Sequence, residues 1–324
     1  MRIVVLALLL PTSLSLLCAC ERSDSATPPT ATSPVNSAKQ QPVELCNWVL
    51  EPVVAASEQN VAIPRLVCAA PSATEICCAL GLRTGIIGRT RFCDYPPGIT
   101  TIPAIGALDE TNVEFLLNLV PDLILVSGTS RAITERLTRL DLPLASLPDR
   151  GLPDIFTAIE QVGELTNRPA SATQLSACLR AELDEITAAY CHVAPARVLV
   201  ITGTLANPPT PPFAAGPDSF YHDLLRRAGH QNVLTDGASA YGPLSLEFIA
   251  RADPDVIIEL DADGRARPGG DTDAVQAWSR IGKMRAVATN RIHVLKGQAH
   301  FIPGPRITYT YRAMCQAIAG ERHD

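Results

Sequence analysis

Short apolar runs alternate with amphipathic stretches in the first half of the chain. Apolar runs of about four to eight residues between turn-forming residues predict buried strands, and apolar positions three or four apart predict helices. Their order here predicts a parallel sheet covered by helices on both faces. We expect strands at 65–70, 84–88, 123–126 and 142–147, and helices at 72–80, 112–120 and 131–140.

Two of these helix starts carry a capping pattern, in which glutamate follows a hydroxyl residue by three positions. Ser72 with Glu75, and Thr111 with Glu114, fit this pattern. In a capping box the hydroxyl accepts a backbone N–H from the first turn, and the carboxylate accepts the N–H of the cap itself. We therefore expect both pairs to act as local helix caps.

The same pattern restarts after two long helical stretches, at 152–166 and 170–190. Apolar residues fall on one face of the first stretch, which is typical of a helix packed against a core. Helix, rather than a flexible hinge, therefore separates two α/β segments. In the second segment we expect strands at 197–201, 232–234 and 291–295, and helices at 218–228, 273–281 and 307–319.

Residues 112–125 and 245–258 have closely similar sequences, NVEFLLNLVPDLIL and SLEFIARADPDVII. Each indicates a short helix, a Pro-Asp stop and a buried strand, so the repeat predicts two similar lobes. A cleft between two lobes is a common place for a ligand. Chance convergence of short helix-to-strand units is the alternative. The identical pairs are Glu114 and Glu247, Phe115 and Phe248, Pro121 and Pro254, Asp122 and Asp255, and Ile124 and Ile257.

The start of the chain predicts export. Residues 1–19 have a positively charged start and an apolar middle too short to span a bilayer, as in a signal peptide. The sequence LCAC at 17–20 resembles a bacterial lipobox, so we expect a lipid on Cys20. A plain secretory cleavage is the alternative. The polar, proline-rich residues 20–45 predict a disordered tether, so we expect a membrane-anchored lipoprotein facing the periplasm or the cell exterior.

Composition and charge exclude several classes of function. The 324 residues are 47% hydrophobic and 19% charged, a globular composition with room for two lobes. A net charge of -6 without a basic block argues against a nucleic-acid partner. A GxSxG motif is absent, Gly81, Gly85 and Gly88 do not form a dinucleotide fingerprint, and Asp261 with Asp263 fits a turn. We therefore expect neither an enzyme nor a resident cofactor.

The mature cysteines do not predict a metal site, because they form neither a CxxC motif nor a zinc-like spacing. An exported chain can form disulfides, but the sequence leaves the pairing open. Cys178 and Cys191 lie about 20 Å apart on one predicted helix, so they cannot pair with each other. The eight cysteines are Cys46, Cys68, Cys77, Cys78, Cys93, Cys178, Cys191 and Cys315.

An ordered set of motifs resembles class III solute-binding proteins of ABC importers, which serve the uptake of cobalamin, iron-siderophores and haem. The motifs are PSATEICCALGL, CDYPPG, the two repeat sequences, NRIHVL and PGPR, and the CDYP sequence favours the cobalamin branch. The resemblance covers about residues 64–319. It implies two Rossmann-like α/β lobes with parallel sheets, at 64–150 and 196–320, and a ligand cleft between them. A long rigid α-helix, placed at 152–166 within a helical segment 151–192, would join the lobes.

The resemblance also implies ligand contacts from loops of both lobes. Tyr95, between Asp94 and two prolines, would present a rigid ring to a flat macrocycle, unless it packs only its own loop. Phe213, in the stretch NPPTPPF, would do the same beyond the end of a strand. His300 would be either a metal ligand or a hydrogen-bonding surface residue. The other expected contacts are Ser127, Thr129, Tyr241, Gln298 and Phe301, in loops where family members often carry tryptophan.

Glu114 and Glu247 have two compatible interpretations. Both lie in the first turn of a predicted helix, where an acidic side chain offsets the helix dipole. In the resembled family one glutamate of each lobe docks onto arginines of the permease. Equivalent residues in two similar lobes would suit a symmetric permease dimer, which presents the same site twice.

The sequence therefore predicts a monomeric, lipid-anchored protein that captures cobalamin or a related corrinoid and delivers it to an ABC permease and its ATPase. An iron-siderophore or haem receptor is the alternative within the class. An orphan envelope sensor or an enzyme on the same fold is the alternative outside it.

Overall fold

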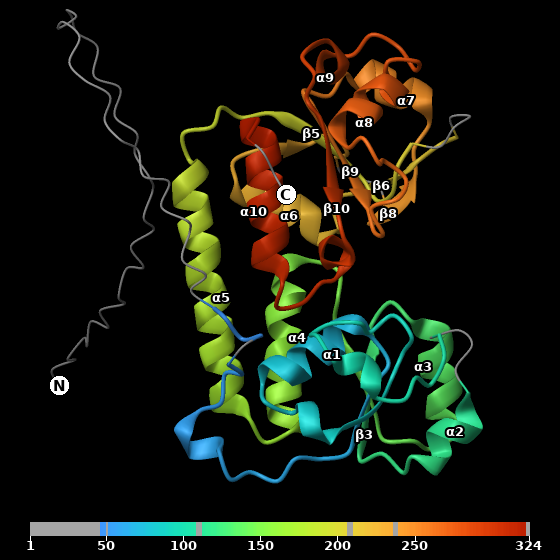
Figure 1. Cartoon of the computed structure of the whole chain (residues 1–324), viewed down its shortest axis with the longest axis vertical. Coiled ribbons are helices and arrows are strands. Elements are labelled where there is room, and N and C mark those ends of the chain that lie inside the picture. The colour runs from blue at the N-terminus through green and yellow to red at the C-terminus, as the bar shows by residue number, and fades with distance from the viewer. Residues whose placement is uncertain (1–45, 50, 108–111, 206–209, 236–238, 322–324) are drawn as a thin grey trace, which may run out of the picture. The chain divides into compact units, whose positions relative to one another are not determined.

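A computed structural model gives the fold of most of the chain (Figure 1). The expected signal peptide, the tether with Cys20, and Thr111 lie outside the residues that it describes. None of the described helices is long and apolar enough to cross a membrane. The described residues are 46–49, 51–107, 112–205, 210–235 and 239–321.

The N-terminal lobe contains a four-stranded sheet that is parallel throughout, as the alternating pattern predicted. Its strands are β1 (Leu66–Cys68), β2 (Ile86–Arg89), β3 (Leu123–Ser127) and β4 (Leu144–Leu147). Its helices are α1 (Pro71–Ala79), α2 (Val113–Asn118) and α3 (Arg131–Thr138), with 3-10 turns at Arg83–Gly85 and Ile99–Thr101. The strand order is β2-β1-β3-β4. Every residue of β1 is buried, because both faces of the sheet are covered.

The C-terminal lobe contains a six-stranded sheet of mixed direction. Its strands are β5 (Arg197–Ile201), β6 (Phe213–Ala215), β7 (Gln231–Asn232), β8 (Tyr241–Pro243), β9 (Val256–Asp261) and β10 (Ile292–Lys296). Its helices are α6 (Phe220–Arg227), α7 (Leu246–Ala252), α8 (Asp271–Trp278), α9 (Arg285–Ala288) and α10 (Ile307–Ala319), with a 3-10 turn at Gln298–Phe301. The path of the sheet is β10-β9-β5-β6-β8, with β7 paired to β5.

The mixed direction differs from the sequence-based expectation of two parallel sheets. Strand β6 runs antiparallel to β5, and β8 runs antiparallel to β6. Each has three residues and lies among prolines and glycines, so the sequence indicated loops there. Phe213 and Tyr241, which we expected in loops, are therefore held by strand pairing.

The sequence repeat corresponds to one local structure present in each lobe. The side chains of Asn112 and Ser245 accept hydrogen bonds from the backbone N–H of Phe115 and Phe248, at 2.9 and 3.1 Å. Asn112, rather than Thr111, is thus the N-cap of α2. The glutamates of the repeat are consequently the second residue of each helix, and not the third as a capping box requires.

The ends of the two repeat units also match. Val120 and Asp253, which follow α2 and α7, have left-handed φ angles of 45° and 46°. Asp122 accepts the backbone N–H of Arg65, just before β1, at 2.8 Å. In the same way Asp255 accepts the backbone N–H of Arg197, the first residue of β5, at 2.8 Å. The repeat therefore reflects the same local structure in both lobes rather than chance.

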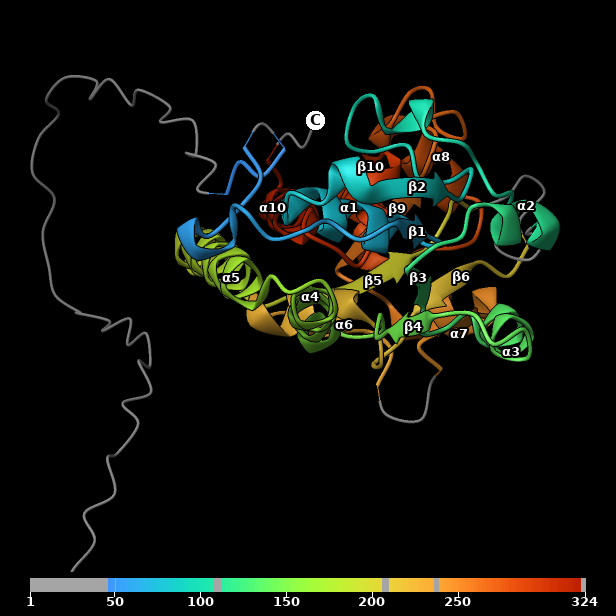
Figure 2. The same cartoon turned by 90° about the horizontal axis from the view of Figure 1, so that it is seen from below.

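Two antiparallel helices, α4 (Leu152–Leu165) and α5 (Pro169–Tyr190), connect the lobes and lie side by side (Figures 1 and 2). Helix α4 packs against α1 of the first lobe and α6 of the second. Helix α5 packs on α10, where Thr187 contacts the Tyr311 hydroxyl at 2.9 Å. The sequence placed the bridge in α4 alone, whereas α5 also contacts both the 3-10 turn Ala56–Glu58 before β1 and α10 of the second lobe.

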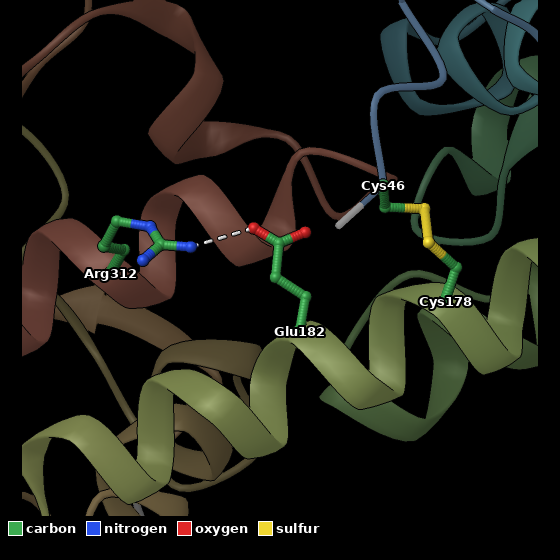
Figure 3. The surroundings of a disulfide bond; sticks show 4 residues. All are labelled: Cys46, Cys178, Glu182 and Arg312. Carbon is green, nitrogen blue, oxygen red and sulfur yellow. Dashed lines mark hydrogen bonds and ion pairs between the residues drawn. A yellow bond between two sulfur atoms is a disulfide. The ribbon is translucent and has the colours of Figure 1, made fainter. Parts of the chain in front are cut away.

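The segment before β1 is fastened to α5. Cys46 forms a disulfide with Cys178, and one turn later Glu182 accepts a hydrogen bond from Arg312 of α10 at 3.0 Å (Figure 3). Glu58, in the 3-10 turn Ala56–Glu58, accepts hydrogen bonds from the Ser171 hydroxyl and from two backbone N–H groups at the start of α5. Burial would raise the pKa of Glu58, but these bonds hold it below its usual value.

Replacing both Cys46 and Cys178 with serine is expected to lower the free energy of unfolding by about 2–5 kcal/mol, because the disulfide closes a long loop of the unfolded chain. The two cysteines are 132 positions apart. Urea-induced unfolding under oxidising conditions measures the difference. The matched control is Cys191→Ser, since Cys191 is an exposed free thiol. An unchanged unfolding midpoint in the double variant would contradict a stabilising role for the disulfide.

A single apolar core continues through both lobes and the two connecting helices. It includes Leu66 and Ile76 of the first lobe, Ile159 of α4, Leu179 of α5 and Val200 of the second lobe. Two smaller clusters cover the other faces of the sheets, one in each lobe. Moving one lobe against the other would disturb this shared core, so the packing favours a rigid molecule with little hinge closure.

Candidate ligand-binding site

Residues of both lobes line one cavity of about 410 Å³, within the range of about 300–1,000 Å³ that is typical of small-molecule sites. The lining residues are Thr129, Asp149, Arg150, Asp218, Ser239, Ala240 and Tyr241. Thr129 and Asp149 lie just beyond the carboxyl ends of β3 and β4, where ligands bind in open parallel sheets. Asp218 precedes α6, and Tyr241 begins β8.

Ser127, Thr129 and Asp149 of the N-terminal lobe form a polar triad, of which Thr129 and Asp149 line the cavity. Strands β3 and β4 pair so that Ser127 lies opposite Leu147, which brings the following residues together. The Ser127 and Thr129 hydroxyls both donate to Asp149 Oδ2, from Thr129 at 3.0 Å. The two hydroxyl oxygens are 2.9 Å apart. The structure thus joins two expected contacts, Ser127 and Thr129, through a carboxylate that sequence reasoning missed.

Tyr241 supplies the main aromatic surface on the opposite side of the cavity. Its side chain is 39% exposed, and its ring meets that of Tyr221 edge-on, with centroids 6.3 Å apart. Burial is the main cause that raises the pKa of the Tyr241 hydroxyl, and the negative charge of Asp149 in the other lobe raises it further. The hydroxyl therefore stays protonated at neutral pH and can donate a hydrogen bond.

Phe213 lies on the same face of the sheet as Tyr241. In the β6–β8 pair, Ala215 is opposite Tyr241 and Phe213 is opposite Pro243. Directly opposed residues of antiparallel strands point to the same face, so Phe213 and Tyr241 are diagonal neighbours. Phe213 is 55% exposed, which is unusual for a large apolar side chain on a paired strand. The pair offers an aromatic surface next to the cavity.

Asp94 and Tyr95 lie at a different contact between the lobes. The Tyr95 ring is half-buried, with the Trp48 ring edge-on at 6.0 Å and the Arg306 guanidinium 3.9 Å above it. Arg306 also forms an ion pair with the buried carboxylate of Glu75, and Asp94 adds a further negative charge nearby. Neither Asp94 nor Tyr95 lines the described cavity.

Glu75 and Ser72 therefore do not form the predicted capping box. The residue before α1 is Ala70, Ser72 lies within the helix, and Glu75 points to the other lobe. Proline at the first helical position already lacks the N–H that a cap would satisfy.

The 3-10 turn Gln298–Phe301 is packed at His300 and Phe301, whereas Gln298 is exposed. His300 is 2% exposed, stacks on Tyr309 with ring centroids 5.1 Å apart, and lies 3.3 Å from the Thr310 hydroxyl. Phe301 packs against the main core. The Tyr221 hydroxyl donates a hydrogen bond to the His300 carbonyl at 2.5 Å. This bond fixes the Tyr221 ring, which in turn contacts the Tyr241 ring edge-on. His300 is thus neither a surface residue nor open to a ligand in this structure.

Glu114 and Glu247 are exposed at equivalent places, the second residue of α2 and of α7. The Glu247 carboxylate is 3.9 Å from Arg251 one turn later, with both side chains mostly in solvent. An exposed pair of this kind contributes little to stability. Both glutamates therefore remain available to a partner.

Sequence reasoning missed four of the charged or polar residues that line the cavity, namely Asp149, Arg150, Asp218 and Ser239. A signal for Asp149 was present, because an acidic residue directly after a predicted strand lies at the same sheet edge as Ser127. Ser239 carried no such signal, since the short strand β8 that follows it was not predicted.

Comparisons with known proteins agree with this architecture. The family model described as periplasmic binding protein matches residues 66–299. The vitamin B12-binding protein of Salmonella typhimurium is 25% identical over 260 residues, covering 80% of this chain and 91% of that protein. The cobalamin-binding protein of Halobacterium salinarum is 29% identical over 289 residues, covering 82% and 74%.

Solved structures show the same two-lobed fold. The periplasmic vitamin B12 binding protein of Vibrio cholerae superimposes with a TM-score of 0.67 at 21% identity, covering 80% of this chain and 98% of that one. The periplasmic heme-binding protein of Roseiflexus sp. RS-1 superimposes with a TM-score of 0.66 at 23% identity, covering 80% and 99%. With a family model that matches most of its length, the chain belongs to the periplasmic binding protein family.

Proposed function

We propose that this protein is the substrate-binding component of an ABC importer and captures cobalamin or a related corrinoid between its lobes. Family membership makes it an exported ligand-binding protein rather than an enzyme, with an ABC permease and ATPase as partners. The observation that carries the proposal is the cavity at the carboxyl ends of β3 and β4, which Tyr241 of the second lobe closes. Relatives named for vitamin B12 or cobalamin, aligned over about four-fifths of the chain, support the choice of ligand.

The aromatic pair favours a large flat ligand. Phe213 and Tyr241 lie on one sheet face next to the cavity and are 55% and 39% exposed. A corrinoid is larger than the cavity, so its polar edge would enter it while its apolar face rests on these rings.

The chemistry of the site favours a corrinoid over haem. A tyrosine must lose its proton to bind iron as a phenolate, and burial together with Asp149 raises the pKa of Tyr241. His300, the histidine expected near the ligand, is buried against Tyr309. Tyr241 and His300 are thus both unsuited to ligate haem iron.

Delivery of the ligand to the permease would involve one docking contact from each lobe. Glu114 and Glu247 would dock onto matching basic sites of a permease dimer. A lipid on Cys20 would hold the monomeric protein at the membrane, and the segment 20–45 would serve as a tether to a fold that begins at the Cys46–Cys178 disulfide.

Thermal unfolding with a panel of ligands tests the choice of substrate. A ligand that binds only the folded state raises the melting temperature, and at equal concentration a tighter ligand raises it more. We expect cyanocobalamin to raise it and haemin and a ferric siderophore to leave it unchanged. A shift with haemin alone would replace the corrinoid by haem, and a shift with the siderophore alone would replace it by that chelate.

Replacing Tyr241 with alanine is expected to weaken cyanocobalamin binding by about 1–3 kcal/mol, as for the loss of a buried aromatic anchor. Calorimetric titration measures the change. Tyr190→Ala is the matched control, because Tyr190 lies at the end of α5 and bonds Glu321 outside the cavity. Equal affinities of the wild type and the Tyr241 variant would remove Tyr241 from the site.

A further inference from the structure

The polar triad beside the cavity offers a ligand hydrogen-bond acceptors but no donors. A hydroxyl has one proton and two lone pairs. Ser127 and Thr129 lie within hydrogen-bond distance of Asp149 Oδ2 and of each other, so both hydroxyl protons are used within the triad. What these two side chains can still offer a ligand is therefore their lone pairs, and the Asp149 carboxylate also only accepts. Three neighbouring side chains thus form a surface made of acceptors.

The rest of the lining adds negative charge and a few donors. Asp218 contributes a second carboxylate, and Arg150 contributes one guanidinium. The protonated Tyr241 hydroxyl is a donor on the opposite side. The cavity therefore combines an acceptor surface on the N-terminal lobe with isolated donors elsewhere, and its aspartates outnumber its basic side chains.

This distribution matches a carboxamide better than a carboxylate of the same shape. An amide has two N–H donors, which suit the triad, and a carbonyl, which suits Tyr241 or Arg150. A carboxylate has only acceptors, so at the triad it would face lone pairs and a like charge without a hydrogen bond. Corrinoids differ from one another in this respect, because their peripheral side chains are amides when mature and carboxylates before amidation.

On the basis of the proposed function, we propose that Ser127, Thr129 and Asp149 select the amidated corrinoid by its peripheral N–H groups and reject the carboxylate form of the same macrocycle. Asp149 is the specificity-determining residue, because as the acceptor of the triad it keeps the hydroxyl protons from the ligand. The importer would thus take up the product of an amidation step and leave its acidic precursor outside.

Calorimetric titration with cobyrinic acid, which has only carboxylate side chains, and with its heptaamide tests this selection. We expect the wild-type protein to prefer the heptaamide by about 10–100-fold, since one buried unpaired polar group accounts for a difference of this order. Asp149→Asn supplies an N–H donor and removes the charge, so this preference should fall at least tenfold. Thermal unfolding of each variant without ligand confirms that the fold is kept.

The matched control is Asp218→Asn, which removes one negative charge from the same cavity without touching the triad. We expect it to change the preference much less than Asp149→Asn does. An equal effect of the two variants would overturn the role of the triad and leave charge alone as the cause. Equal binding of both corrinoids by the wild type would overturn only this inference. Binding of neither would overturn the proposed function together with it.

Discussion

Replacing both Glu114 and Glu247 with alanine is expected to reduce corrinoid uptake to the level of cells without this protein, while ligand affinity is unchanged. Both glutamates are exposed at the second position of equivalent helices, and neither lines the cavity. Their helices should survive the change, because Asn112 and Ser245 supply the N-caps. Uptake of labelled cyanocobalamin and calorimetric titration of the same variant separate transport from binding.

The matched control replaces Glu164 and Glu185, which are exposed on α4 and α5, and so makes the same change in net charge. Uptake should remain normal in this control. The two single variants should each lose part of the uptake, since each would leave one of the two docking contacts. Normal uptake in the Glu114 and Glu247 double variant would mean that these carboxylates only offset helix dipoles.

Replacing Arg306 with methionine is expected to lower the free energy of unfolding by about 3–5 kcal/mol, the usual cost of leaving a buried charge without its partner. Arg306 donates to both carboxylate oxygens of Glu75, at 3.1 and 2.6 Å. The Glu75 side chain is 1% exposed, so water cannot replace the guanidinium. The change also removes the cation above the Tyr95 ring. Urea-induced unfolding measures the loss.

The loss should grow with pH. Burial raises the pKa of Glu75 from 4.5 to about 7, against the lowering effect of Arg306. The folded state therefore holds a proton that the unfolded chain releases, and this group's contribution to stability falls as pH rises from about 4.5 to about 7. Without Arg306 the folded pKa should rise further, so the variant should lose more at about pH 8 than at about pH 5.

Glu75→Gln combined with Arg306→Met is the control for this explanation. Removing both charges should restore part of the stability, because no unpaired carboxylate remains. A double variant no more stable than Arg306→Met, or a loss independent of pH, would show that the effect comes from packing and not from the ion pair.

The repeat and the order of strands and helices could be predicted because they depend on local sequence. Pro121 and Pro254 end a helix before a buried strand in both lobes, and this pattern requires no knowledge of the partner strands. Helix α10 runs from Ile307 to Ala319, as predicted, since a long amphipathic stretch is the strongest local signal. The strands β6 and β8 were missed because three residues among prolines and glycines carry no periodicity.

The site could be predicted only in part, because its contacts are long-range. Ser127 and Thr129 were expected from the strand end, but their partner Asp149 is 22 and 20 residues away. Glu75 has the sequence of a local cap, yet it pairs with Arg306, 231 positions further along. Tertiary packing decided both cases, and it also buried His300, whose sequence gave no sign of the Tyr309 ring beside it.

Rigidity connects the fold to the proposed function. One core runs through both lobes, the Cys46–Cys178 disulfide fastens the N-terminal segment to α5, and Glu75 with Arg306 links α1 to the start of α10. A rigid pair of lobes would hold the cavity open for the ligand and keep Glu114 and Glu247 at a fixed separation. Docking onto a symmetric permease requires such a fixed spacing.

Calorimetric titration of the purified protein with cyanocobalamin tests the capture of a corrinoid most directly. We expect saturable binding of one ligand per chain, weakened by Tyr241→Ala and retained by Tyr190→Ala. Absence of binding to cyanocobalamin and cobinamide, with saturable binding of haemin or a ferric siderophore to the same preparation, would contradict it.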